Sequence, residues 1–418
     1  MAGCCFATSG APLPADAGFR LGTRIGNTAV TGAADVHPRI DLRRHIQWSS
    51  VEPTRNAAYK WAEIDSLVAA LKSNNINCLG VISQTPAWAS STSVGGNIYP
   101  NPADLPSLYA FVTAAVNRYK ATIKEWEVYN ECDFRGWTAA QYAQVAIGCS
   151  AAIRAADPTA TVVTGVSIVP PVTRGGNNSG PWWDALMANA AFMAASDVFS
   201  WHLYCKGNPA PAPEIGDKKG AVDDIIPASI NRTRAAGFKG EIWITESGWT
   251  TDPAGNIDPV TGKAKNLTTD DNQASFLVRM AVMYADLGID RWYQFQLNGA
   301  NTGDESGGMG LWNPPRINGG SKKPSWAAYQ TACNFLIGAT NVTRLGSAAG
   351  VYLYALAKAD GRAAWCAWTV AGNASVSISG LPATVRRTLR DGAQSTVSTT
   401  AGVLTITAGP SPIWVEIV

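Results

Sequence analysis

Two patterns of apolar positions alternate along the first 340 residues or so of the chain. Short apolar runs rich in β-branched residues, typical of buried strands, occupy 19–25, 40–48, 76–83, 124–130, 160–166, 198–204, 241–246 and 291–297. Amphipathic stretches typical of helices lie between most of them, at 61–72, 105–119, 139–155, 182–194, 222–236, 271–287 and 325–336. This alternation predicts parallel strands covered by helices, and eight strands predict a (β/α)8 barrel over residues 19–338. The connection between the first two strands is too short for a full covering helix.

The pattern changes after about residue 338. Stretches such as VYLYALAKAD and GVLTITAG alternate apolar and polar positions and are separated by Gly and Pro. They predict a small antiparallel β-sandwich over residues 339–418, packed on the barrel. Residues 1–18 are small and rich in Pro and Gly, without the cationic start and apolar core of a signal peptide, so we expect a flexible segment there.

Composition excludes several classes of function. The net charge is only +2, and no run of Lys and Arg offers a surface for nucleic acid. No stretch approaches the roughly 20 apolar residues that a membrane helix needs. Histidine occurs only at His37, His45 and His202, and neither HExxH nor CxxC is present, so we expect no metal and no cofactor.

The eight cysteines leave two interpretations open. An even count fits disulfides in an exported protein, whereas buried free thiols are an equally good interpretation in a chain of 418 residues. The expected location is secreted or periplasmic. The sequence does not indicate an oligomeric state.

Two predicted strands end in glutamate. The fourth reads WEVYNE and ends at Glu131, and the seventh reads EIWITE and ends at Glu246. Active sites of such barrels lie at the C-terminal ends of the strands, so both carboxylates should face one cleft. Glycoside hydrolysis requires this pair, because one carboxyl protonates the leaving oxygen while the other stays ionised.

Neighbouring strands supply candidate partners for these carboxylates. His202 and Tyr204 are two residues apart on the sixth strand and therefore share a face. Arg43 on the second strand would keep a nearby carboxylate ionised, while Arg44 should point the other way. Glu127, which shares strand parity with Glu131 but lies deeper, is expected to form an internal ion pair.

These residues carry a family resemblance. The stretches RRHIQWSSVEP, SQTPAWAS, WEVYNECD, FSWHLY, WITESGW and SKKPSWAAYQ make the chain resemble the (β/α)8 glycoside hydrolases of clan A, and most of all family 39, the β-xylosidase and α-L-iduronidase family. The resemblance implies that Glu131 is the general acid/base and Glu246 the nucleophile. It further implies that Asn130 binds the sugar 2-hydroxyl, and that the nucleophile is oriented by Tyr204, His202 and Arg43.

The chain departs from the clan pattern at one site residue and in one connection. Cys132 stands where the clan usually has Pro after Asn-Glu, which predicts an extra disulfide or a looser loop. The short connection between the first two strands is the second departure.

The 16 tryptophans divide by position. Those inside strands and helices are expected to pack in the core. Six fall in loops or element ends after the strands, and we expect two or three of them to line sugar subsites, because an aromatic face suits the C–H face of a pyranose; they are Trp88, Trp137, Trp182, Trp183, Trp249 and Trp312. Trp292, on the eighth strand, is a candidate for the floor of the site.

The sequence thus predicts a retaining hydrolase of β-linked glycosides that needs no cofactor and acts on a carbohydrate. The alternatives are a non-catalytic carbohydrate-binding barrel, which would usually lack one carboxylate, and a transglycosylase. The resemblance implies β-xylosides first, then glycans of mannose, glucose, galactose or arabinose. Tryptophans spread over several loops favour an oligosaccharide or polysaccharide, and the loops 256–266 and 302–315 would decide between exo and endo action.

Overall fold

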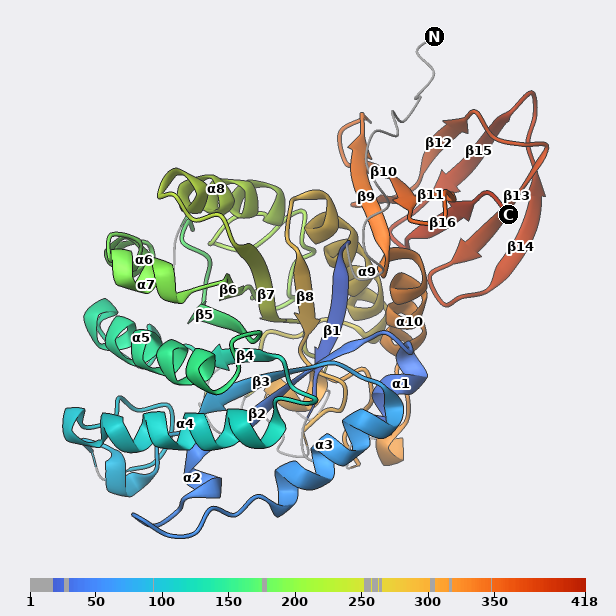
Figure 1. The fold of residues 1–418 in the computed structure, drawn as a ribbon. Helices are drawn as coiled ribbons and strands as arrows, with labels where there is room; N and C mark the ends of the chain where they lie inside the picture. The colour runs from blue at the N-terminus through green and yellow to red at the C-terminus, as the bar shows by residue number, and fades with distance from the viewer. Residues whose placement is uncertain are drawn as a thin grey trace.

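The structure is a computed structural model, and it describes residues 18–25, 30–92, 94–174, 179–251, 257, 262, 265–300, 305–315, 318–346 and 348–418. These residues form a closed barrel of eight parallel strands followed by antiparallel sheets (Figure 1). The predicted fold class is therefore confirmed. Of the predicted flexible segment, all but Gly18 lies outside the described residues.

The barrel strands pair in sequence order, and β1 closes onto β8 with Leu21 opposite Trp292. Their bounds are β1 Arg20–Arg24, β2 Asp41–Gln47, β3 Cys78–Ser83, β4 Glu125–Val128, β5 Thr161–Ser167, β6 Val198–His202, β7 Glu241–Ser247 and β8 Arg291–Gln294. Nearly every strand residue is buried, because side chains fill the barrel inside and helices cover it outside. The predicted strands extend two or three residues too far at β4, β6 and β8, where the chain turns into the loops of the barrel mouth.

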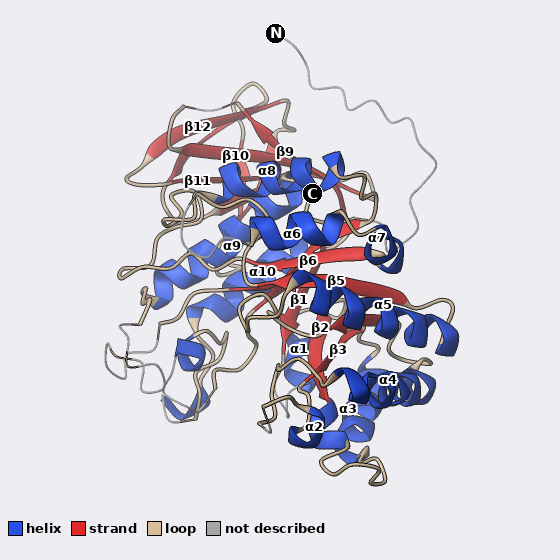
Figure 2. Cartoon of the chain, turned by 90° about the vertical axis from the view of Figure 1, so that its left-hand side faces the viewer, coloured by secondary structure: helices blue, strands red, loops and turns tan. Residues whose placement is uncertain are grey.

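Helices surround the strands, as the quarter-turned view shows (Figure 2). Their bounds are α1 Val30–Val36, α2 Trp48–Val51, α3 Ala62–Asn74, α4 Leu105–Tyr119, α5 Ala139–Ala156, α6 Gly180–Met187, α7 Ala190–Ala195, α8 Val222–Ala235, α9 Asp270–Asp286 and α10 Pro324–Leu336. Short 3-10 turns are η1 Ala87–Ala89, η2 Pro102–Asp104, η3 Glu305–Gly308 and η4 Asn318–Gly320. No helix among the described residues is long and apolar enough to cross a membrane.

One helical prediction needs correction. The expected helix 182–194 is two helices, because Asn189 Oδ1 accepts hydrogen bonds at 3.1 Å from the backbone N of Ala191 and Phe192 and so starts α7 anew. The connection between β1 and β2 was predicted to be too short for a full covering helix, and it contains only the seven-residue helix α1, which packs against α3 and α10.

The C-terminal strands form two sheets. A six-stranded sheet has the order β14-β13-β16-β11-β10-β9, and β12 pairs with β15. The bounds are β9 Ala339–Leu345, β10 Val351–Lys358, β11 Ala363–Thr369, β12 Ala374–Ser379, β13 Thr384–Leu389, β14 Gln394–Ser398, β15 Val403–Ala408 and β16 Ile413–Glu416. Leu353 and Val385 of the larger sheet share a buried core with Ile378 and Ile406 of the smaller one, as in a sandwich.

The sheets pack on the barrel at α9 and α10 (Figure 1). A buried polar contact fixes them, because Glu214 accepts a 2.5 Å hydrogen bond from Trp368 Nε1 of β11 and pairs with Arg279 of α9 at 3.5 Å. Glu214 and Arg279 are both buried, and each neutralises the charge of the other, so the contact favours one orientation of the sheets on the barrel.

The described cysteines are free and buried. They are Cys78, Cys132, Cys149, Cys205, Cys333 and Cys366. Of the two interpretations left open by the sequence, the buried-thiol one holds for these six residues, and burial raises the pKa of the Cys78 thiol to about 12. Cys4 and Cys5 lie outside the described residues.

Candidate active site

Glu131 stands three residues past the end of β4. The backbone N of Tyr129 donates to Ile82 O of β3 at 2.7 Å, and the N of Glu131 donates to Val166 O of β5 at 2.8 Å. Tyr129 and Glu131 adopt left-handed φ angles of 62° and 51°, a conformation that costs a non-glycine residue about 1–3 kcal/mol. The two adjacent strands thereby fix the direction of Glu131 at the C-terminal mouth of the barrel.

Glu246 lies inside β7 with both carboxylate oxygens bound. Arg43 Nη1 of β2 donates to Oε1 at 2.5 Å, and Tyr204 OH donates to Oε2 at 2.9 Å. The residue is only 7% exposed, so its orientation is set by these two donors rather than by water. A carboxylate held in this way presents one fixed edge to the cleft.

The Arg43 guanidinium joins three acceptors. Besides Glu246 it binds Glu127 Oε2 through Nε at 2.5 Å and Asn130 Oδ1 through Nη2 at 2.7 Å. The predicted internal ion pair of Glu127 is therefore confirmed, and it is fully buried. Because Asn130 Oδ1 accepts from Arg43, its Nδ2 is the group left to donate to a ligand.

Arg44 points outward to Glu63 of α3, as strand alternation predicts.

His202 lies between the two carboxylates. Its Nδ1 is 2.9 Å from Glu131 Oε1 and 3.6 Å from Glu246 Oε2, while Nε2 is 3.2 Å from Thr245 Oγ1. Burial alone would lower the pKa of His202, but the two carboxylates more than offset this, and the pKa lies above its ordinary value. The buried ring therefore favours the charged form, in which both ring nitrogens donate.

The environment keeps Glu246 ionised. Burial alone would raise its pKa, but the charges of His202, Arg43 and Arg24 and the hydrogen bond from Tyr204 outweigh burial and hold the pKa below its ordinary value. A carboxylate with a depressed pKa is anionic at neutral pH, which is the state a nucleophile requires.

The carboxylates are close together. One carboxylate oxygen of Glu131, one carboxylate oxygen of Glu246 and one ring nitrogen of His202 all lie within 4.8 Å of one another. Carboxylate oxygens this close favour the spacing of retaining glycosidases, whose carboxyl groups are roughly 5–5.5 Å apart, over the roughly 6.5–9.5 Å of inverting ones. The same three residues have the spacing of metal ligands, but both Glu246 oxygens already accept hydrogen bonds, and the adjacent Arg43 cation opposes a second cation.

Three of the tryptophans expected to bind sugar are packing residues. Trp137 and Trp249 are 4% and 2% exposed, and the rings pack against Tyr129 and Phe276 respectively. Trp292 points out of the barrel, where Nε1 donates to Ser247 Oγ at 2.6 Å and the ring packs against helices α9 and α10. Strand parity explains the Trp292 error, because only alternate residues face the interior.

The other four loop tryptophans differ in burial. Trp183 is fully buried, whereas Trp88, Trp182 and Trp312 are half-buried. Trp88 is fixed by its Nε1 hydrogen bond to Glu52 O at 2.9 Å, and Trp312 stacks on Trp326 at 4.9 Å. The half-buried rings are the ones that retain accessible surface for a ligand.

Two further polar residues join the site. Arg24, the last residue of β1, donates through Nη1 to Gln296 Oε1 at 2.5 Å, and its Nε is buried without a partner among the described residues. Its charge lies close enough to Glu246 to lower the pKa of that carboxyl. The strand-end rule that selected Glu131 would also have selected Arg24, whereas Gln296 follows an irregular turn after β8 with no sequence signal.

Cys132 produces neither of the predicted consequences. The thiol is free and buried, so there is no extra disulfide among the described residues. The loop is also firmly held, because Asp133 accepts from Ile168 N at 3.1 Å and from Ser179 Oγ. These contacts take over the role that a rigid proline has in fixing the backbone after the glutamate.

Comparisons with known proteins show which family and which folds the chain resembles. Residues 40–145 match the model of Glycosyl hydrolase family 10. Three solved structures, each 17% identical in sequence, share the fold. A family 39 glycoside hydrolase from the gut symbiont Bacteroides cellulosilyticus WH2 has a TM-score of 0.76, and the match covers 98% of this chain and 82% of that chain. A glucosidase from Croceicoccus marinus has a TM-score of 0.67 and a monomeric β-xylosidase from Caulobacter crescentus CB15 one of 0.62, and each match covers 97% of both chains. The predicted resemblance to the clan A (β/α)8 glycoside hydrolases is confirmed by the family match and the shared fold.

Proposed function

We propose that this protein is a retaining O-glycosyl hydrolase that cleaves β-linked glycosides. The observation that carries the proposal is the pair of carboxylates from β4 and β7, whose oxygens lie within 4.8 Å of each other. Glu246 is held anionic by Arg43 and Tyr204, and Glu131 reaches the same point from the opposite side of the mouth. This asymmetry assigns Glu246 as nucleophile and Glu131 as acid/base.

In the first step a Glu246 oxygen bonds to the anomeric carbon as the glycosidic carbon–oxygen bond breaks. The bonding electrons go to the leaving oxygen, which takes the proton from Glu131. His202 stabilises the resulting Glu131 anion through Nδ1, at 2.9 Å. Arg43 remains bonded to the esterified Glu246 through the carbonyl oxygen.

In the second step Glu131 removes a proton from water, whose oxygen bonds to the anomeric carbon. The ester bond breaks and its electrons return to Glu246, which again accepts hydrogen bonds from Arg43 and Tyr204. Two inversions leave the anomeric configuration unchanged. Asn130, with Nδ2 directed away from Arg43, would donate to the sugar 2-hydroxyl, where hydrogen bonds strengthen in the transition state.

The proposed substrate is a β-xyloside within an oligosaccharide or polysaccharide. The proposed specificity is like that of family 39. Support comes from the fold shared with a family 39 hydrolase and a β-xylosidase, and a β-glucoside is the second choice because a glucosidase shares the fold as well. A secreted or periplasmic location would suit a polymeric substrate. Most of the loop 256–266 and part of the loop 302–315, which bear on exo or endo action, lie outside the described residues.

Paired variants test the assignment. Glu246→Ala should abolish turnover of every glycoside, whereas Glu131→Ala should slow unactivated β-xylosides by about 10²–10⁴-fold. Aryl glycosides with good leaving groups should be slowed much less, because their first step needs little acid assistance and only the second step lacks its base. Near-normal activity of Glu246→Ala would refute the roles. Proton NMR of the first-formed sugar should show the β-anomer, and an α-anomer would refute the retaining mechanism.

A further inference from the structure

One aromatic side chain in the described part of the chain is exposed to solvent. It is Phe134, which is 54% exposed, whereas every other described Phe, Tyr and Trp is buried or half-buried. Phe134 lies three residues after Glu131, in the loop between β4 and α5. The ring with the most accessible surface is therefore a phenylalanine beside the proposed acid/base, and not a tryptophan.

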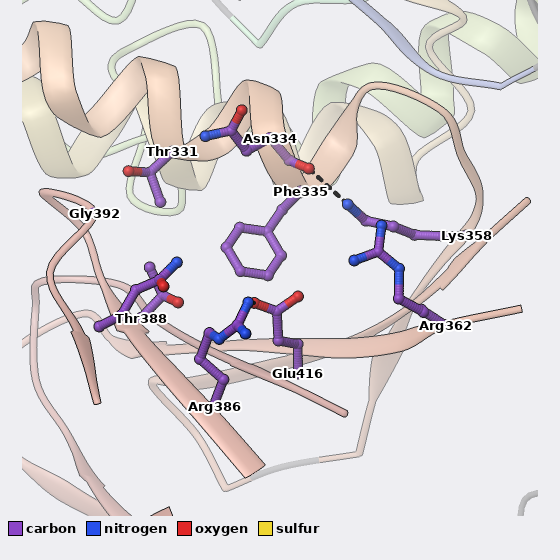
Figure 3. A pocket seen from close by; sticks show the side chains of 10 residues that line it. Thr331, Asn334, Phe335, Lys358, Arg362, Arg386, Thr388, Gly392 and Glu416 are labelled. Atoms are coloured by element: carbon purple, nitrogen blue, oxygen red, sulfur yellow. Dashed lines mark hydrogen bonds and ion pairs between the residues drawn. The ribbon is translucent and has the colours of Figure 1, made fainter. Parts of the chain in front are cut away.

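Aromatic rings in other surface hollows are covered by their neighbours. The hollow between α10 and the six-stranded sheet has Phe335 at its centre (Figure 3). This ring is only 4% exposed, because it stacks on Trp414 with centroids 4.4 Å apart and Lys358 Nζ lies 5.4 Å from its centroid. It contributes to packing and has no face left for a ligand. Phe134 has no stacking partner among the described rings, so a face of this ring stays open.

The backbone around Phe134 is fixed by a tight turn. The turn closes as a Schellman motif, in which Trp137 N donates to Cys132 O at 3.0 Å. Gly136, with a φ of 79°, donates through its N to Asp133 O at 3.3 Å. Cys132 and Trp137 are buried, and the Asp133 carboxylate is held by the loop after β5. One side of the turn is thus anchored in the barrel, and Phe134 projects from the other side.

Exposed apolar side chains of the barrel gather at its mouth. Besides Phe134, the side chains of Val94, Ile215 and Ile257 are more than half exposed, and they lie in the loops after β3, β6 and β7. In the described part of the barrel, every large apolar side chain that is exposed lies in one of these four loops. Exposed apolar surface that is confined to one face, and to the face that carries the carboxylate pair, indicates a binding surface.

The proposed reaction determines what lies against Phe134. Glu131 protonates the glycosidic oxygen, and the leaving unit is bonded to that oxygen, so this unit must lie beside Glu131. The other sugar is held at Glu246 and Asn130, across the bond that is cleaved. A flat aromatic ring suits the C–H face of a pyranose. Arg135, whose guanidinium lies 5.6 Å from the centroid of the Phe134 ring, is exposed and offers N–H donors to the sugar hydroxyls.

We propose that Phe134 binds the leaving sugar of a β-linked oligosaccharide by stacking on its C–H face. This assignment rests on the proposed function, because it assumes the roles of Glu131 and Glu246. It names the leaving unit as a pyranose rather than an aryl or alkyl group.

The same ring would bind an acceptor sugar that replaces water in the second step. In that transfer the acceptor oxygen bonds to the anomeric carbon and Glu131 takes its proton, while the ester bond breaks and its electrons return to Glu246. The acceptor therefore approaches along the path by which the leaving sugar departed. Binding of the leaving sugar and of the acceptor should depend on Phe134 to the same extent.

Two donors that differ in the leaving group test the proposal. Xylobiose, or the best β-linked disaccharide found, has a leaving sugar, whereas the β-glycosyl fluoride of the same sugar has none. Phe134→Ala should lower the ratio of kcat/KM for the disaccharide to kcat/KM for the fluoride by about three- to tenfold, the loss expected for one aromatic contact. With the fluoride as donor and a free sugar as acceptor, the yield of transfer product relative to hydrolysis should fall by a similar factor.

Two further variants make the test specific. Phe134→Tyr keeps the flat ring and should keep the wild-type ratio. Leu389→Ala, which shortens an exposed apolar side chain at the end of β13, is the matched control and should also keep it. Thermal unfolding establishes that each variant is folded, and the exposed position of Phe134 predicts little change in melting temperature.

The other outcomes overturn the proposal in distinguishable ways. An unchanged ratio in Phe134→Ala would show that the ring does not bind the leaving sugar, although the hydrolase assignment would stand. A loss in Phe134→Tyr as large as that in Phe134→Ala would show that stacking is not the cause. A larger loss with an aryl glycoside than with the disaccharide would indicate an apolar leaving group instead of a sugar. A wild-type protein that hydrolyses no β-glycosyl fluoride and no β-linked disaccharide would refute the proposed function, and the role of Phe134 with it.

Discussion

Tyr204→Phe isolates one of the contacts that keep the proposed nucleophile ionised. The variant removes the hydroxyl that donates to Glu246 Oε2 at 2.9 Å and keeps the ring, which packs edge-on to Phe295 with centroids 6.3 Å apart. The hydroxyl stabilises only the anionic form of Glu246, so its loss must raise the pKa of that carboxyl. The change affects one oxygen and leaves Arg43 bound to the other.

The size of the shift follows from the strength of the contact. A hydrogen bond to a charged group contributes about 1.5–3 kcal/mol, and one pKa unit corresponds to about 1.4 kcal/mol, so the bond accounts for about one to two units. Water entering the vacated space would replace part of the stabilisation. We therefore expect the pKa of Glu246 to rise by about one unit, still restrained by Arg43 and His202.

The assay is the pH dependence of kcat/KM on an aryl β-xyloside, or on the best aryl glycoside found, because this parameter reports ionisations of the free enzyme. The acid limb should move toward neutral pH by about one unit, and the basic limb much less. Tyr329→Phe is the matched control, since it removes a buried hydroxyl that donates to Gly22 O at 2.6 Å away from the carboxylates. An unmoved acid limb in Tyr204→Phe would refute the account of how Glu246 stays ionised.

Two further predictions separate binding from packing. Arg24→Met should raise KM about tenfold with little change in the melting temperature, because among the described residues Arg24 Nε has no partner and Nη1 binds only Gln296 Oε1. Steady-state kinetics test this, and an unchanged KM would make Arg24 structural. Trp292→Ala should lower the free energy of unfolding by about 3–5 kcal/mol, measured by denaturant titration, because the ring is fully buried between β8 and the helices. Trp88→Ala, at a half-buried ring, should cost less stability, and a loss as large as that of Trp292→Ala would contradict the distinction.

The catalytic pair was predictable because the rules behind it are local. Glu131 and Glu246 end apolar runs, and parallel barrels bring the C-terminal ends of all strands to one face. Arg43 and Arg44 were assigned opposite directions by strand parity alone, and the structure agrees, with Arg43 on Glu246 and Arg44 on Glu63. The period of two along a strand needs no knowledge of the rest of the fold.

The tryptophans were not predictable in the same way. Whether Trp137 or Trp249 faces a sugar depends on which side chains from other elements cover the ring, and Tyr129 and Phe276 lie far away in sequence or on separate elements. Loop position was taken as a sign of exposure, yet both rings are buried. Burial is a property of tertiary packing, so a large apolar side chain in a loop is more often an anchor for that loop than a platform for a ligand.

The buried pair of Arg43 and Glu127 explains how the site tolerates a change of charge during the reaction. When Glu246 becomes an ester it loses its negative charge, and Arg43 would then be a buried cation without a counter-charge, which is very costly. Glu127 prevents this, because it binds Arg43 Nε at 2.5 Å and takes no part in bond breaking. Arg43 can therefore stabilise the Glu246 carboxylate before the first step and after the second, and remain neutralised in between. The deeper glutamate on β4 is thus part of the catalytic arrangement even though it lies too deep to reach the sugar.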